Sequence, residues 1–200
     1  MRAAGYFFAR VRVEVAGAPT TTAVDAITVT RSVKRLAHEI AERNTGAQNL
    51  VLIGIVRRGA ALAERLTGAL EAVGMANVPV GTLDISSYRD DGRGAPGDPC
   101  LLGRDIPFAL DRTRVVLVDD VLYTGRTVRA ALDALADLGQ PESIQLAVLV
   151  DRGERELPIR ADYVGRNIEA PRDQRVYVRL AEVDGVDEVV IGGAKRGAAA

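Results

Sequence analysis

The chain has 200 residues, of which 48% are hydrophobic and 26% are charged, and its formal net charge is −1. This composition is typical of one globular domain, and a near-neutral charge excludes any general attraction to nucleic acid, although the 26 Lys and Arg residues could still gather on one face. The single cysteine, Cys100, excludes an intrachain disulfide and favours a reducing, cytoplasmic location. His38 is the only histidine, which excludes a multi-histidine metal site, and no apolar run approaches the about 20 residues of a membrane span.

The two ends of the chain have little pattern. Residues 1–24 contain scattered apolar residues broken by Gly17-Ala18-Pro19, and their first apolar stretch is too short for a signal peptide. We predict a flexible extension at 1–24 and a flexible tail at 192–200, which leaves 25–191 as a single domain.

The first clear element is a helix from about Asp25, a side chain that suits an N-cap, to Arg43. Apolar residues recur at helical spacing, and Asn44-Thr45-Gly46 marks the end. One face carries cations at positions i, i+3, i+4 and i+7. This face is either a solvated surface or a contact for an anion or RNA. The basic residues on this helix are Arg31, Lys34, Arg35, His38 and Arg43.

Continuous apolar runs at residues 50–56, 114–118 and 144–150 are typical of parallel strands that are buried on both faces. A further apolar run covers 78–85, a short strand is expected at 175–180, and helical patterns lie between the runs. This alternation predicts an α/β fold with a mostly parallel sheet. Ligands bind such sheets at the carboxyl ends of the strands, so the charged turns after the runs should converge on one crevice.

The segment from Ser86 to about Asp111 is long, polar and rich in glycine, proline and charge. Loops of this length are uncommon unless they are functional or mobile. We therefore expect either a lid that closes over a ligand or a disordered insert.

The most informative stretch runs from Val115 to Thr127, where an apolar run meets Asp119-Asp120 and then the turn Thr124-Gly125-Arg126-Thr127. Backbone N–H groups and hydroxyls at a helix N-terminus favour a phosphate, and glycine allows its close approach. The carboxylates suit sugar hydroxyls or a Mg²⁺ ion instead. A ligand with ribose hydroxyls and a 5′-phosphate satisfies both halves, and the alternative is a structural N-cap turn.

This stretch, V-V-L-V-D-D-V-L-Y-T-G-R-T, resembles the 5-phosphoribosyl-1-pyrophosphate (PRPP) motif of type I phosphoribosyltransferases. Within them it is most similar to the PyrR family of pyrimidine-operon regulators, which also act as uracil phosphoribosyltransferases. The resemblance covers roughly residues 25–190. It implies the type I phosphoribosyltransferase fold, with a mostly parallel central sheet flanked by helices and a small hood. Further similar runs are residues 37–40, 42–44, 88–91, 143–153 and 155–163.

The resemblance also implies roles for single residues. Asp119 and Asp120 would hold the ribose hydroxyls and help to place Mg²⁺, partly through PRPP. Arg58, Arg89 on the lid and the two aspartates would be catalytic, and Arg57, where the family usually has threonine, would share the pyrophosphate turn with Arg58. Arg152 and the backbone near Val176 would lie at the uracil end. The remaining PRPP-binding or nucleotide-binding residues would be Val121, Leu122, Tyr123, Thr124, Gly125, Arg126 and Thr127.

Purine phosphoribosyltransferases commonly carry Asp just before the T-G pair, and Tyr123 at that position disfavours a purine. The implied reaction is uracil + PRPP giving UMP + pyrophosphate, in a homodimer or larger homo-oligomer. The family also implies binding of the pyr mRNA leader, with UMP or UTP as effector. A plain phosphoribosyltransferase for another base, without RNA regulation, is the alternative. The candidate RNA contacts outside the first helix are Arg155, Arg160 and Arg166.

Overall fold

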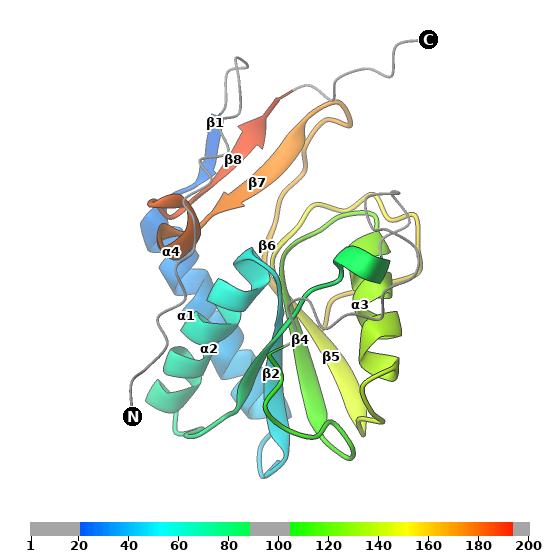
Figure 1. Ribbon diagram of the computed structural model, residues 1–200. Coiled ribbons are helices and arrows are strands. Elements are labelled where there is room, and N and C mark those ends of the chain that lie inside the picture. Colours follow the sequence, from blue (N-terminus) through cyan, green and yellow to red (C-terminus); the bar gives the residue numbers. More distant parts are fainter. Residues whose placement is uncertain (1–20, 89–104, 194–200) are drawn as a thin grey trace.

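The fold is built on a parallel sheet of five strands in the order β3-β2-β4-β5-β6 (Figure 1). The computed structural model describes residues 21–88 and 105–193. The strands confirm the predicted α/β fold with a mostly parallel sheet. The strands that form the predicted apolar runs lie near their expected positions. Their bounds are Leu50–Ile55 for β2, Val80–Leu83 for β3, Arg114–Leu122 for β4, Ser143–Asp151 for β5 and Tyr163–Asn167 for β6.

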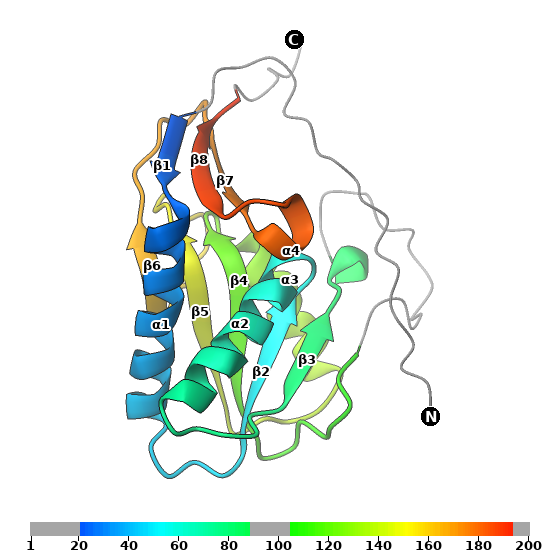
Figure 2. The same ribbon diagram turned by 90° about the vertical axis from the view of Figure 1, so that its left-hand side faces the viewer.

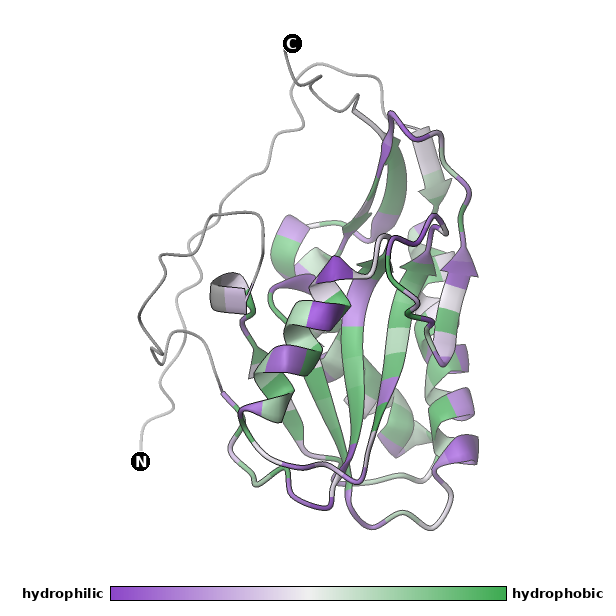
Figure 3. Cartoon of the chain, turned by 90° about the vertical axis from the view of Figure 1, so that its right-hand side faces the viewer, coloured by the Kyte–Doolittle hydropathy of each residue, from purple (hydrophilic) through white to green (hydrophobic). Residues whose placement is uncertain are grey.

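Helices cover both faces of this sheet (Figures 1 and 2). Helices α1 (Ala26–Arg43) and α2 (Arg58–Ala72) pack on one face, and α3 (Arg126–Ala136) packs on the other. Alternate residues of β4 enter the two cores, since Val116 and Val118 lie with α1 and α2 whereas Val115 and Leu117 lie with α3. Figure 3 shows the resulting hydrophobic strands between the helical layers. Burial on both faces explains the continuous apolar runs.

A second, antiparallel sheet of three strands, in the order β1-β8-β7, forms the hood above the carboxyl edge of the large sheet (Figure 1). We use this name for β1 (Thr21–Val24), β7 (Arg175–Arg179), the short helix α4 (Ala181–Asp184) and β8 (Glu188–Gly192). The flexible extension predicted for 1–24 is therefore wrong for its last four residues, which pair with β8. Gly192, assigned to the flexible tail, ends β8. Residues 1–20 and 194–200 lie outside the described residues.

Other boundaries also differ from those expected. Helix α1 confirms the helix that was predicted from about Asp25 to Arg43. The Asp25 carboxylate caps it by accepting a hydrogen bond from the Thr28 N–H at 2.8 Å. Strand β4 runs to Leu122, so Asp119 and Asp120 lie within the strand rather than after it. Strands β6 and β8 and helix α4 were not predicted. In the expected lid, 86–88 form a short 3-10 helix, and 89–104 lie outside the described residues together with Arg89.

Across residues 21–88 and 105–193, none of the helices has the length and apolar character that crossing a bilayer requires.

Candidate active site

The turn after β2 packs directly against the backbone of β4. A Cβ atom on Gly59 would lie 2.4 Å from the Val118 carbonyl oxygen, and one on Gly54 would lie 2.4 Å from the Cα of Ala60. Such contacts exclude any side chain, so glycine at both positions allows the close approach. The Val56–Arg57 peptide is cis. Arg58 is the first residue of α2 and lies close enough to attract the Asp120 carboxylate of β4.

The adjacent carboxylates occupy different environments near the end of β4. Asp119 is buried, with 6% of its surface exposed, and its Oδ1 accepts the Asp120 N–H at 3.0 Å. Asp120 is half-buried, and its Oδ1 accepts the Val121 N–H at 2.9 Å. Burial raises the pKa of Asp120 above its usual value of 3.8, and the opposing attraction of the Arg58 guanidinium offsets only part of that rise. These carboxylates place acidic oxygens near the end of β4, and such oxygens suit hydroxyl donors or a cation.

The turn between β4 and α3 has the geometry of a phosphate site. Gly125 adopts a left-handed conformation (φ 92°) directly before α3. A Cβ there would lie 3.3 Å from the Leu157 Cβ, so the β5–β6 connection covers this side of the turn. The Thr124 carbonyl accepts the N–H groups of Glu156 and Leu157 at 3.0 and 3.1 Å. The N-terminal amides of α3 therefore lie at the end of this turn, where the peptide dipoles of a helix favour an anion.

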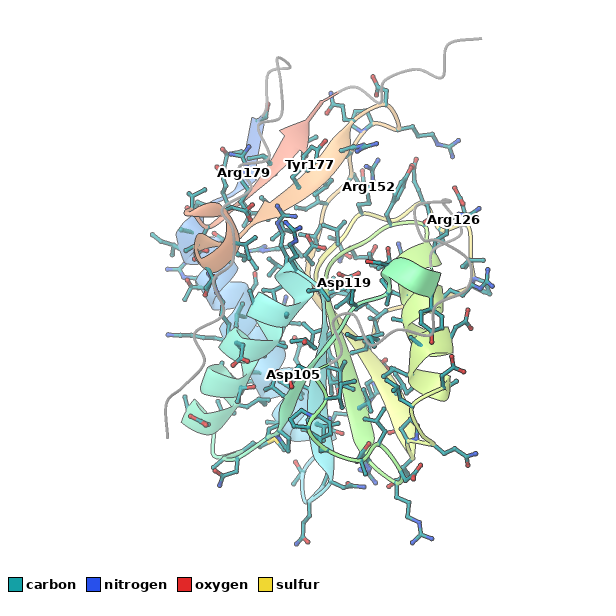
Figure 4. All side chains as sticks on the ribbon, viewed as in Figure 1. Asp105, Asp119, Arg126, Arg152, Tyr177 and Arg179 are labelled. Carbon is teal, nitrogen blue, oxygen red and sulfur yellow. The ribbon has the colours of Figure 1, made fainter. Side chains whose placement is uncertain are left out.

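Arg152 is 6% exposed, and it holds the segment that leads into β7. Its guanidinium lies 4.2 Å from the centroid of the Tyr123 ring. Nη1 donates to the Gln174 carbonyl at 2.9 Å, and Nη2 donates to the carbonyls of Ala170 and Pro171 at 3.3 and 3.2 Å. Arg152 thus holds in place the chain segment that leads to Val176, at the predicted uracil end. Figure 4 shows Arg152 and the hood residue Tyr177 above Asp119.

Hood carboxylates also bind the arginines of α2. Asp184 forms a two-point ion pair with Arg58, from Nη2 to Oδ1 at 2.7 Å and from Nε to Oδ2 at 3.0 Å. Arg65 binds both Glu182 and Asp187. Asp184 was not among the predicted site residues, because nothing in the local pattern around α4 indicates that this loop meets the N-terminus of α2.

The predicted RNA residues fall into groups with different surroundings. Arg31, Lys34 and His38 are exposed on α1, and the last two border a hollow of about 640 Å³ between α1 and α2. Arg35 and Arg43 face β6 instead. Arg35 donates to the Val164 carbonyl at 2.9 Å and to the Gly165 carbonyl, and it pairs with Glu39. Arg43 pairs with Asp162 at 2.8 Å and lies over the Tyr163 ring.

The residues of the β5–β6 region divide in a similar way. Arg166 on β6 is exposed, and Arg160 is exposed beside a hollow of about 570 Å³. Arg155 turns inward: it donates to the carbonyls of Tyr123, Gly153 and Ile159, each at 3.0 Å, and pairs with Asp151. Arg35 and Arg43 thus lie at the α1–β6 contact and Arg166 is exposed on the same strand, whereas Arg155 holds the turn after β4 through the Tyr123 carbonyl.

Comparison with known proteins agrees with this geometry. The family model described as the phosphoribosyl transferase domain matches residues 23–181. A relative from Roseiflexus sp. (strain RS-1), named "Bifunctional protein PyrR", is 59% identical over 84% of this chain and 92% of its own. One of the same name from Deinococcus deserti is 58% identical over 86% of this chain and 94% of its own.

Solved structures show the same fold. A hypoxanthine phosphoribosyltransferase from Staphylococcus aureus superposes with a TM-score of 0.65 at 20% identity, over 88% of this chain and 93% of the other. The enzyme from Trypanosoma cruzi gives 0.68 at 22% identity, over 86% and 90%. At this identity the likeness concerns the fold alone, whereas the family model and the sequence relatives settle the family. The chain belongs to the phosphoribosyltransferases, in the group of bifunctional PyrR proteins.

Proposed function

We propose that the protein transfers the phosphoribosyl group of PRPP to uracil, and that it also binds the pyr mRNA leader as a pyrimidine-responsive regulator. One observation carries the enzymatic half: the Asp119-Asp120 pair lies in β4 just before the left-handed Gly125 turn, with Arg58 close enough to attract Asp120. This arrangement offers acceptors for hydroxyls, amides for a phosphate and a cation for a pyrophosphate, in one place. The PyrR relatives support both halves, since their name calls them bifunctional.

In this proposal each part of PRPP meets a group of matching chemistry. The 5′-phosphate takes the amides and hydroxyls of 124–127, and the ribose hydroxyls donate to Asp119 and Asp120. The pyrophosphate lies toward Arg57 and Arg58. The bond from C1′ to the pyrophosphate oxygen breaks, a bond from C1′ to N1 of uracil forms, and the N1 proton is released. Arg58 stabilises the charge that develops on the departing pyrophosphate.

The donor set also fits Mg²⁺. Asp119 and Asp120 provide the carboxylate oxygens that this ion prefers. Within the described ranges, no group of three or more His, Cys, Asp and Glu residues is placed to hold a metal. The ion would therefore take its other ligands from PRPP and water. When bound, it supplies positive charge beside the pyrophosphate.

The surroundings of Tyr123 support a pyrimidine rather than a purine. Its ring is covered by the Arg152 guanidinium, which is itself held by the carbonyls of Ala170, Pro171 and Gln174. A carboxylate that could serve a purine nitrogen is absent from this position. The smaller base would lie between this stack and the backbone near Val176.

The enzymatic proposal is tested with labelled uracil, PRPP and Mg²⁺. We expect UMP to form, and Asp120→Asn to reduce its formation by at least about a hundredfold, since the variant loses a charged acceptor for the ribose. Asp133→Asn on the exposed face of α3 is the matched control and should retain full activity. Absence of UMP with the parent protein, together with product from hypoxanthine or guanine, would favour the alternative of another base.

The RNA half rests on the contact between α1 and β6. Arg35 and Arg43 are held against β6 by bonds to its carbonyls and by the Tyr163 ring, and Arg166 extends from the same strand. Exposed Arg160, which precedes β6, is a further candidate contact, and exposed Lys34 and His38 add cations on the α2-facing side of α1. Phosphate contacts from such a region give affinity that falls with salt, while hairpin shape and loop bases give specificity.

A gel-shift titration with the leader RNA, with and without UMP, tests this half. The double variant Arg160→Ala/Arg166→Ala should weaken binding at least about tenfold and flatten its salt dependence. Arg114→Ala, at the amino end of β4 and paired with Glu142, is the control and should bind as the parent does. Equally tight binding to an unrelated hairpin would speak against specific regulation.

A further inference from the structure

The Asp184 carboxylate is fixed on both sides. Its Oδ2 accepts the N–H of Leu180 at 3.0 Å, across the short helix α4, and the two oxygens together bind Arg58. A two-point pair of this kind sets the plane of the guanidinium as well as its position. Arg58 therefore has its direction set by a hood residue that lies far from it in the sequence.

The pair occupies only one edge of the guanidinium. Arginine has five N–H donors, and Asp184 engages Nε and one hydrogen of Nη2. The Nη1 group and the second Nη2 hydrogen point elsewhere. Arg58 is also attracted by Asp120, across the proposed PRPP site. Asp184 thus leaves one edge of Arg58 for an anionic ligand while it holds the other.

This pair is partly removed from solvent. The side chains of Arg58 and Asp184 are 29% and 15% exposed. Burial alone would raise the pKa of Asp184, but the hydrogen bonds from Arg58 and Leu180 outweigh it and hold that pKa below its usual value of 3.8. The carboxylate is consequently charged at neutral pH.

The attachment of the hood to α2 does not depend on Asp184. Two turns further along α2, Arg65 binds Glu182 from Nε at 2.8 Å, and it binds Asp187 from Nη1 and Nη2 at 3.0 and 2.6 Å. Strands β1, β8 and β7 also hold the hood together through their own ladder. Because Arg65 provides this second anchor between the hood and α2, the specific contribution of Asp184 is the orientation of Arg58.

We propose that Asp184 is a positioning residue for phosphoribosyl transfer, which orients Arg58 so that its unoccupied edge meets the pyrophosphate of PRPP. This inference rests on the proposed role of Arg58 in pyrophosphate binding. It also connects the two ends of the site, because the segment that carries Asp184 follows directly from β7 and Val176.

Steady-state kinetics of the full-length protein with PRPP, Mg²⁺ and uracil test the proposal. Asp184→Asn keeps an acceptor for Leu180 but gives up the two-point charged pair. We expect its KM for PRPP and its inhibition constant for pyrophosphate to rise about tenfold, with a smaller change in kcat. Glu182→Gln is the matched amide substitution at the Arg65 anchor, and both constants should stay within about twofold of the parent.

A double-mutant cycle separates positioning from a general structural role. If Asp184 acts through Arg58, Asp184→Asn should cause no further rise in the KM for PRPP once Arg58 is replaced by alanine. Additive effects, or equal effects of Asp184→Asn and Glu182→Gln, would overturn the inference while UMP formation by the parent still supports the proposed function. If Asp184→Asn does not fold, Asp184→Ser, which also retains an acceptor for Leu180, is measured in the same cycle.

Discussion

The guanidinium of Arg152 lies over the ring of Tyr123, 4.2 Å from its centroid. These residues follow the carboxyl ends of neighbouring parallel strands, β5 for Arg152 and β4 for Tyr123. The stack therefore joins the start of the PRPP loop to the segment before β7, which Arg152 binds through three carbonyls. A single side chain connects the turn after β4 with the segment that leads into the hood.

Replacement of Arg152 by lysine should loosen this connection. A lysine keeps the charge, but its single ammonium cannot reproduce the fork that meets three carbonyls or the flat stack on Tyr123. We expect a loss of about 1–3 kcal/mol in the free energy of unfolding and a higher KM for uracil. Urea denaturation and steady-state kinetics measure the two effects. Arg172→Lys, at a neighbouring arginine that is 86% exposed, should change neither, and a matching loss there would contradict this account.

Gly59 offers a test of the close approach between the pyrophosphate turn and β4. In Gly59→Ala the new Cβ would lie 2.4 Å from the Val118 carbonyl oxygen, so the turn must move. We expect about 1–3 kcal/mol of destabilisation and at least a tenfold fall in kcat/KM for PRPP.

Gly68 in the same helix supplies the control for that substitution, because a Cβ there meets nothing within 4 Å. Gly68→Ala should leave kcat/KM unchanged and stabilise the protein by about 0.5–1 kcal/mol, from helix propensity alone. Full activity in Gly59→Ala would mean that the position of the turn does not govern PRPP binding.

Asp120 should lower the stability of the ligand-free protein. Burial raises its pKa above 3.8, so the folded state binds the proton more tightly than the unfolded state does. The charged carboxylate therefore destabilises the fold above its folded pKa. Asp120→Asn, which keeps an acceptor for the Val121 N–H, should melt at a higher temperature than the parent at pH 7. The difference should disappear below about pH 3.8, and a lower melting temperature of the variant at pH 7 would contradict the assignment.

The ion pairs of Arg65 should make the stability of the fold depend on pH in the opposite direction to Asp120. Hydrogen bonds from Arg65 lower the pKa values of Glu182 and Asp187 from their usual 4.5 and 3.8. Their stabilisation is present above those usual values and is lost as the pH falls through the lowered ones. Arg65→Met should therefore be less stable than the parent at pH 7 in thermal scans. The two proteins should converge toward pH 3, and a constant difference would show that Arg65 acts by packing rather than charge.

The large sheet and the turn between β4 and α3 could be predicted because their signals are local. Burial on both faces of β2, β4 and β5 leaves uninterrupted apolar runs, and the Asp119-Asp120 pair followed by Gly125 carries its chemistry within a few residues. The predicted end of β4 was too early because charged residues usually mark the end of a strand, whereas here the ladder with β5 continues as far as Leu122 and Asp151.

The hood and its contacts could not be predicted in this way. Strand β1 has four residues, three of them exposed, and its partner lies at the opposite end of the described chain. Asp184 looks like an ordinary surface charge in the sequence, and Arg155 was predicted as an RNA contact. Only the tertiary fold brings Asp184 to Arg58 and Arg155 to the Tyr123 carbonyl. Such roles depend on long-range packing, which local periodicity does not encode.

The pairing of Thr21 with Ile191 also has a consequence for synthesis of the protein. On the ribosome, residues 21–24 emerge long before the strand that they join. The large sheet and its phosphate turn are complete by residue 167, so they can assemble while the hood is still missing. A nascent chain released before residue 188 would carry the predicted ribose and phosphate residues of the site without the closing strand of the hood. The predicted uracil end, near Val176, would therefore be completed after the rest of the proposed site.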